Sequence, residues 1–178
     1  GQAGDAYESH ADRVADTAAA PDPYIDDIPA GPFEELVVGS GLATARAADG
    51  RVVSFGSYST TAPTDAFAML TAGYRETCGV KQDGGLACWA DTTLDDGEYA
   101  YIADTPTGGT WSAVVSGYGH SCALATDGTA QCWGEDSHGQ ASPPSGVFTA
   151  LGAGQDNTCG VREDTSIECW GDKSYLGS

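Results

Sequence analysis

Six cysteines are the residues of this chain whose number and spacing point most directly to chemistry. The chain has 178 residues, and the cysteines fall into three pairs with nine residues between partners: Cys78 and Cys88, Cys122 and Cys132, Cys159 and Cys169. An even number at regular spacing favours disulfides in an oxidising compartment. Zinc is the alternative, but zinc ligands usually lie about two to four residues apart, and no such cysteine or histidine pair occurs.

Motifs for catalysis are missing elsewhere in the sequence. The three histidines, His10, His120 and His138, form no metal-binding pair, and no nucleophile elbow, phosphate loop or dinucleotide fingerprint occurs. Ser121 adjoins His120, which fits a triad of converging side chains poorly. The sequence therefore predicts no enzyme, no cofactor and no metal site. Calcium is an alternative for the four aspartates between residues 91 and 104, but their spacing favours solvated carboxylates.

The charge of the chain limits its partners. With 26 acidic and 7 basic residues the formal charge is −19, which argues against a nucleic-acid partner. No apolar run is long enough for a transmembrane helix. The chain starts at Gly1 without methionine, which either a cleaved secretion signal or shortening for expression explains. Together with the cysteines, this favours an extracellular or cell-surface location.

Four repeats organise residues 33–178. We take Phe33, Phe67, Trp111 and Phe148 as position 0 of each repeat. Position 6 is then always glycine, position 11 is threonine or cysteine, and position 22 is Phe55, Trp89, Trp133 or Trp170. Every Phe and Trp of the chain lies at position 0 or 22, so the repeat is genuine.

Each repeat reads as short strands around a hairpin turn. Asp127-Gly128 is a strong hairpin signal, and a loop over 126–128 with a left-handed Gly128 places Cys122 opposite Cys132. The same count opposes the other two cysteine pairs, so we expect disulfides Cys78–Cys88, Cys122–Cys132 and Cys159–Cys169. Each bridge contributes about 3 kcal/mol in the loop-entropy model.

The first and last repeats depart from this pattern. Thr44 and Ser54 replace the first cysteine pair, where a cross-strand hydrogen bond can substitute weakly, and Arg46 replaces an aliphatic residue. We expect the first repeat to be the least stable. In the fourth repeat Thr165 replaces the turn glycine, so we expect a different turn there, because positive φ is costly for a β-branched residue.

The segment from Trp111 through Cys122, Asp127-Gly128 and Cys132-Trp133-Gly134 to Gly139-Gln140 resembles a regulator of chromosome condensation repeat, closest to the secreted, cysteine-paired bacterial variety. The resemblance covers about residues 33–172. It implies an all-β propeller with one blade per repeat, usually seven in a ring. Four blades form either a small closed ring or an open arc that other chains complete, by closing the ring or by stacking into a filament.

The resemblance also indicates where binding residues lie. In this family, the variable loops after the position 6 glycine share one face and often carry contacts. The candidate binding residues are Tyr74, Arg75, Tyr118, His120, Asp156 and Asn157, against the alternative of ordinary surface variation. The repeat aromatics can also be read as a stacking platform for sugars, but their framework positions favour the core.

Residues 1–32 form an acidic N-terminal arm outside the repeats, with a possible short helix over 8–20. We expect it to pack on its own domain or to reach a neighbouring subunit. Together, these features predict a non-enzymatic, secreted repeat protein that acts through protein–protein contacts and assembles with copies of itself as an extracellular structural or filament subunit. The alternative is a binding or inhibitor module that uses the loop face, as in the β-lactamase inhibitor of this family.

Overall fold

A computed structural model describes residues 31–58, 61–90 and 100–174, and the fold of these residues is all-β. In this part of the chain, the strands form four separate antiparallel sheets of three strands each, as the four repeats predict. Within each sheet the strands are neighbours in chain order. We call the sheets blades 1 to 4.

The strand bounds follow the repeats. Blade 1 contains β1 (Phe33–Gly39), β2 (Leu42–Ala47) and β3 (Val52–Phe55), and blade 2 contains β4 (Phe67–Ala72), β5 (Glu76–Lys81) and β6 (Leu86–Ala90). Blade 3 contains β7 (Trp111–Ser116), β8 (His120–Ala125) and β9 (Ala130–Gly134), and blade 4 contains β10 (Phe148–Ala153), β11 (Asn157–Arg162) and β12 (Ile167–Gly171).

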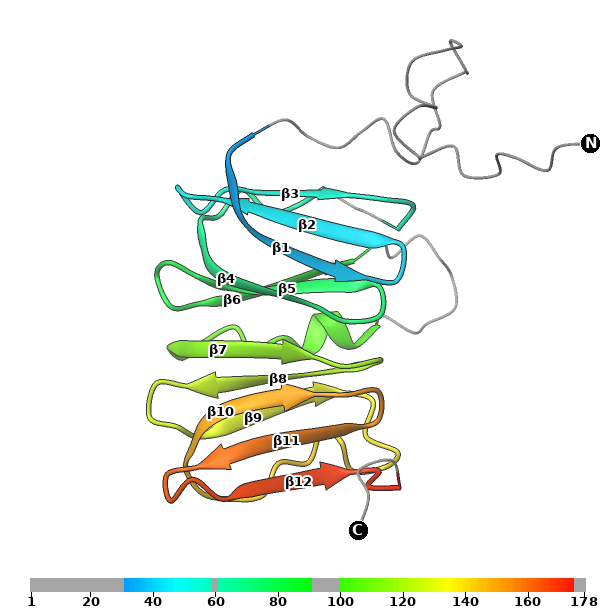
Figure 1. The fold of residues 1–178 in the computed structure, drawn as a ribbon, viewed down its shortest axis with the longest axis vertical. Coiled ribbons are helices and arrows are strands. Elements are labelled where there is room, and N and C mark those ends of the chain that lie inside the picture. The colour runs from blue at the N-terminus through cyan, green and yellow to red at the C-terminus, as the bar shows by residue number, and fades with distance from the viewer. Residues whose placement is uncertain (1–30, 59–60, 91–99, 175–178) are drawn as a thin grey trace, which may run out of the picture.

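The blades follow one another along the long axis of the molecule, with blade 1 at one end and blade 4 at the other (Figure 1). The first strands of successive blades contact each other, β1 with β4, β4 with β7 and β7 with β10. Apolar clusters fill the space between blades, as where Phe67, Leu70 and Trp89 of blade 2 pack against Val37 and Val52 of blade 1. The described blades therefore form an open stack rather than a closed ring.

The hairpin register agrees with the count from the turn. Cys122 pairs with Cys132 across β8 and β9, and Gly128 has a φ of 84°. The structure contains the three disulfides Cys78–Cys88, Cys122–Cys132 and Cys159–Cys169, each with a Cα–Cα distance of 4.0 Å. In blade 1, Thr44 Oγ1 and Ser54 Oγ share a hydrogen bond of 2.8 Å at the equivalent place.

The turn of blade 4 corrects one expectation. Thr165 has a φ of 70°, so it adopts the left-handed conformation of the glycines it replaces, and the turn does not differ. The amide of Thr165 donates to the carbonyl of Arg162, and the Asp164 carboxylate accepts from the amide and hydroxyl of Ser166. These local hydrogen bonds fix the turn, and the threonine bears the strain.

The connector between blades 2 and 3 also differs from expectation. The sequence Tyr99-Ala100-Tyr101-Ile102 would suit an added edge strand, but Ala100–Asp104 forms the 3₁₀ helix η2. Ile102 packs against the apolar cluster between blades 2 and 3, and its carbonyl accepts from the amide and hydroxyl of Thr105. The apolar side chain thus serves packing between blades rather than strand pairing.

Some expectations concern residues outside the described part of the chain. These are the arm over residues 1–30, including the helix at 8–20, and the aspartates Asp91, Asp95 and Asp96. In the described ranges, no helix has the length and hydropathy of a membrane span.

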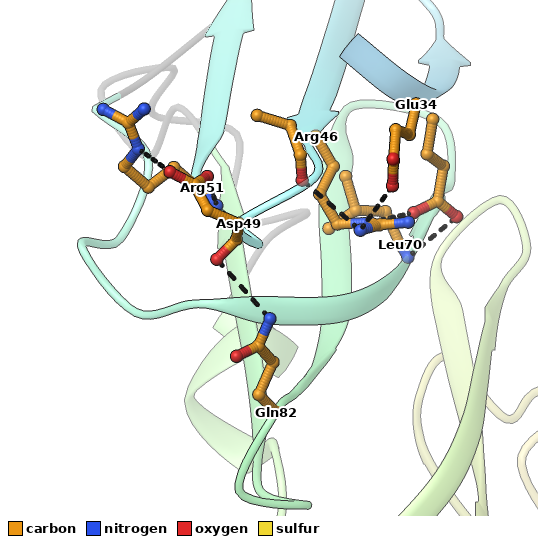
Figure 2. A network of polar contacts seen from close by, with 8 residues as sticks. Glu34, Arg46, Asp49, Arg51, Leu70 and Gln82 are labelled. Atoms are coloured by element: carbon orange, nitrogen blue, oxygen red, sulfur yellow. Dashed lines mark hydrogen bonds and ion pairs between the residues drawn. The ribbon is translucent and has the colours of Figure 1, made fainter. Parts of the chain in front are cut away.

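Besides their apolar contact, blades 1 and 2 meet through charged groups (Figure 2). Arg46 donates from Nε to Glu35 Oε2 at 2.6 Å, and Glu35 Oε1 accepts from the amide of Leu70 at 3.2 Å. Glu35 and Arg46 are register partners across β1 and β2. The equivalent pair in blade 2 is Met69 and Val80, so this junction replaces an apolar pair by an ion pair.

Candidate binding surfaces

The glycine at position 6 sets the close approach of neighbouring blades. A β-carbon on Gly39, Gly73 or Gly117 would lie within 2.6 Å of the carbonyl oxygen of the equivalent glycine in the next blade. On Gly154, the three atoms nearest to such a β-carbon all belong to the end of the Asn157 side chain of its own blade. The loops that follow these glycines are therefore brought side by side along one edge of the stack.

Four side chains of this loop edge form a continuous row, which we call the tyrosine row: Tyr58, Arg75, Tyr74 and Tyr118. The Arg75 guanidinium lies 4.4 Å from the ring centroid of Tyr58 and 4.9 Å from that of Tyr74. The rings of Tyr74 and Tyr118 stack with centroids 4.3 Å apart and planes 29° from parallel. The row joins blades 1, 2 and 3, and Tyr118 is its most exposed described member.

A shallow, open depression lies at the Tyr118 end of the row. It is lined by Tyr74, Tyr118, Gln155 and the backbone around Gly117 and Gly154. The amide of Tyr118 donates to the carbonyl of Gln155, which holds the loops of blades 3 and 4 together. The depression can receive a side chain but does not enclose a small molecule.

His120 lies beneath this edge rather than on it. Its side chain is fully buried, and Nε2 lies 2.8 Å from Thr158 Oγ1 in blade 4. Thr158 Oγ1 donates to the carbonyl of Gln140, so it accepts from Nε2, and Nδ1 has no hydrogen-bond partner among the described residues. Burial lowers the pKa of His120, against the opposing effect of the Asp156 and Asp136 carboxylates. We assign His120 to the packing of blades 3 and 4.

Asp156 and Asn157 stand apart from the tyrosine row. The carbonyl of Asp156 accepts from the amide of Asp172, and its side chain is half-buried. Asn157 begins β11, and its side chain fills the space next to Gly154. Of the six predicted residues, the structure brings Tyr74, Arg75 and Tyr118 into one row.

A second candidate surface is the outer side of blade 1, which we call the N-terminal face. It carries Phe33, Leu36, Val38, Val53 and Phe55. In blade 2, the residues equivalent to Phe33, Leu36, Val53 and Phe55 pack against the preceding blade. Leu36 and Val38 are 59% and 67% exposed, whereas Leu70, the equivalent of Leu36, is 4% exposed.

The outer side of blade 4 is the opposite surface, which we call the C-terminal face. It carries Ala150, Gly152, Val161, Ile167 and the Cys159–Cys169 disulfide. In blade 2, the equivalents Met69, Val80, Leu86 and Cys78 pack against blade 3. Ile167 is 70% exposed and Leu86 is 8% exposed. Cys159 is half-buried, while Cys78 and Cys122 are fully buried.

Three of these features escaped sequence reasoning. Nothing in the sequence singles out Tyr58, because it lies after β3 and outside the loops that follow the position 6 glycines. An open arc of blades implies two uncovered ends, but the sequence does not show which residues form the two end faces. The Glu35–Arg46 pair had a visible signal: two apolar repeat positions, 2 and 13, carry opposite charges in the same repeat.

Comparison with known proteins supports the repeat family. Residues 111–140 match the family model of the Regulator of chromosome condensation (RCC1) repeat. No curated protein sequence matches the chain.

Solved structures of propeller proteins resemble the fold. The ectodomain of the Physcomitrella patens receptor kinase CR4 is 27% identical, with a TM-score of 0.67 over 80% of this chain and 42% of that one. The CRINKLY WD40 ectodomain of Arabidopsis thaliana ACR4 is 28% identical, with a TM-score of 0.62 over 78% of this chain and 49% of that one. Yeast RCC1 (Prp20), bound to Kap60, is 13% identical with a TM-score of 0.63 over 82% of this chain and 45% of that one, and shows the fold alone. The chain thus spans less than half the length of these proteins.

Proposed function

Because this chain consists of regulator of chromosome condensation-type repeats in a cysteine-paired variety, we propose that it is a non-enzymatic extracellular protein that acts through protein–protein contacts and assembles with copies of itself. The repeat fold itself indicates a protein-interaction module. Self-assembly is the more specific part of the proposal.

The observation that carries self-assembly is the exposure of framework apolar residues at both ends of the stack. Leu36, Val38 and Ile167 are each more than half exposed. These side chains lie on the two outer sheet faces of the stack. In the inner blades, the equivalent faces are covered by the neighbouring blade. Exposed apolar patches with open sheet faces mark sites of protein contact.

Two features support an extracellular location. Three disulfides close hairpins in a chain whose described part contains no free cysteine. Disulfides persist in oxidising compartments, and both plant structures that resemble the chain are receptor ectodomains.

Sedimentation of the full chain over a range of concentrations and salt tests the proposal. The charge of −19 opposes association, so we expect assembly to strengthen from about 0.01 M to about 1 M salt as the Debye length shortens from about 30 Å to about 3 Å. Divalent cations should act in the same direction. A monomer at every concentration and ionic strength contradicts self-assembly.

A second candidate function is binding of another protein through the loop edge, and the tyrosine row favours it. Stacked aromatic rings beside a guanidinium are typical of interface hot spots. For any partner that is captured, Tyr118→Ala should weaken binding by more than about tenfold. The matched control is Gln131→Ala, which changes an exposed residue of β9 away from the row. Unchanged binding by Tyr118→Ala contradicts this site.

A further inference from the structure

The three junctions inside the chain all use the same pairing of faces. The C-terminal side of one blade packs on the N-terminal side of the next, as Cys78, Val80 and Leu86 pack on Trp111, Val114 and Trp133. The N-terminal face of blade 1 and the C-terminal face of blade 4 are the two halves of this same pairing. A second copy therefore offers each open face the surface that its repeat positions normally meet.

Blade 1 lacks the polar groups that need a partner in the preceding blade or connector. The indole of Trp89 donates to Ser54 Oγ, and that of Trp170 donates to the carbonyl of Gln140. At this position blade 1 has Phe55, which needs no acceptor. At position 10, where Thr158 donates to the carbonyl of Gln140, blade 1 has Ala43.

A face of this composition can be covered by another molecule without leaving polar groups unpaired. In a docked pair, Ile167 of one copy would face Phe55 of the next, as Leu86 faces Trp133 inside the chain. Ile167 is as large as Leu86, and Phe55 is smaller than tryptophan. The apolar faces are thus complementary in character and in the repeat positions that they expose.

One backbone feature at each open end of the stack matches the same geometry. The amides of Phe67, Trp111 and Phe148 donate to the carbonyls of Gly50, Gly84 and Gly128, the turn glycines of the preceding blades. Thr165 has the left-handed φ of these glycines, and Phe33 stands in the place of the donors.

The side chain of Thr165 is compatible with one of the internal junctions. A β-carbon on Gly84 would lie 3.5 Å from Thr110, which is ordinary contact, whereas on Gly50 it would lie 2.9 Å from Phe67. Docking at Thr165 must therefore follow the spacing of the junction between blades 2 and 3.

We propose that copies of this chain assemble head to tail, with the N-terminal face of one copy, around Leu36 and Val38, seated on the C-terminal face of the next, around Ile167 and the Cys159–Cys169 disulfide. This inference rests on the proposed self-assembly and specifies its interface. Heterologous contacts of this kind close into a ring or continue as a filament, according to the rotation per copy.

Two variants, each with one face blocked, test the polarity. Leu36→Asp blocks the N-terminal face and Ile167→Asp blocks the C-terminal face, and both sites are exposed, so the fold should tolerate the change. Each variant alone should sediment as a monomer. An equimolar mixture should form a heterodimer and nothing larger, because one good face remains on each partner. Ala48→Asp, an exposed residue beside the β2–β3 turn, is the control with the same added charge and should assemble like wild type.

A third variant tests the register of the contact. In the free chain, the atoms nearest to a β-carbon at Gly154 belong to the end of the Asn157 side chain, which can move aside. In the docked pair it would lie against the Gly39 carbonyl oxygen of the next copy, by equivalence with the internal junctions. Gly154→Ala should therefore weaken assembly at least tenfold and leave the unfolding transition nearly unchanged.

The outcomes separate the two proposals. A wild type that stays monomeric overturns self-assembly and the head-to-tail contact together, and assigns the faces to another occupant. A wild type that assembles while either blocked variant alone still dimerises indicates a symmetric face-to-face contact and overturns only the present inference. A mixture that fails to form heterodimers does the same.

Discussion

Substituting Gly117 by alanine should destabilise the protein through the close approach of blades 3 and 4. The new β-carbon would lie 2.7 Å from His120 Nδ1 and closer still to the carbonyl oxygen of Gly154. Both neighbours are held in place, one as a buried ring and the other as backbone. Overpacking of this kind costs about 3 kcal/mol, and the lower entropy of the unfolded alanine chain offsets up to about 1 kcal/mol. We expect a net loss of about 2 kcal/mol.

Denaturant unfolding of the oxidised protein, followed by tryptophan fluorescence, measures this loss, and thermal unfolding should show a Tm lower by about 4–8 °C. Gly152→Ala, in β10 of blade 4, is the control for the same change of residue type, since a β-carbon there has nothing within 4 Å and the residue has no positive φ. The control should be as stable as wild type or slightly more stable. If Gly117→Ala and Gly152→Ala unfold at the same denaturant concentration, the close approach of the glycines does not hold the blades in register.

Further changes address the buried histidine, the missing disulfide and the strained turn. The pKa of His120 is lowered in the folded state, so the unfolded state binds more protons below about pH 6.5, and the free energy of unfolding should fall as pH drops from about 7.5 to about 5.5. In His120→Asn, which places the blade 4 residue at this position, that part of the pH dependence should vanish. The double substitution Thr44→Cys and Ser54→Cys should form a fourth disulfide, because these residues are register partners like the other three cysteine pairs. It should stabilise the protein by up to about 3 kcal/mol and slow hydrogen exchange in β1–β3. Unchanged hydrogen exchange would argue against the expectation that blade 1 is the least stable. Thr165→Gly should raise the free energy of unfolding by about 1 kcal/mol, because it removes side-chain strain at a φ of 70°, and a loss of stability would show that the threonine is not strained.

The framework of the fold could be predicted because its causes are local. The turn at Asp127-Gly128 fixes the hairpin register within a few residues of chain, and the register then fixes the cysteine pairing. The same count succeeds at Asp164-Thr165, even though the expected change of turn was wrong. There, the hydrogen bonds of Asp164 determine the turn more strongly than the β-branched side chain opposes it.

The candidate site could be predicted only in part, because its causes lie in neighbouring blades. The repeat count places Tyr74 and Tyr118 at equivalent loop positions, but only the spacing of blades 2 and 3 stacks their rings. His120 occupies a loop-proximal position in the sequence, yet the absence of a side chain at Gly117 lets it turn inward toward Thr158. Residue type alone does not distinguish an exposed aromatic from a buried one at such positions.

The two candidate functions use different kinds of residue, framework residues in one case and loop residues in the other, so substitutions can separate them. The end faces consist of framework positions, so their residues are limited to those that also form a blade, and their exposure follows from the open ends of the stack. The tyrosine row consists of loop residues that no strand pairing requires, so its side chains can vary without loss of fold. Tyr118→Ala should thus leave assembly intact, and Leu36→Asp should leave loop-edge binding intact. If one variant abolished both, the row and the end faces would form parts of a single interface.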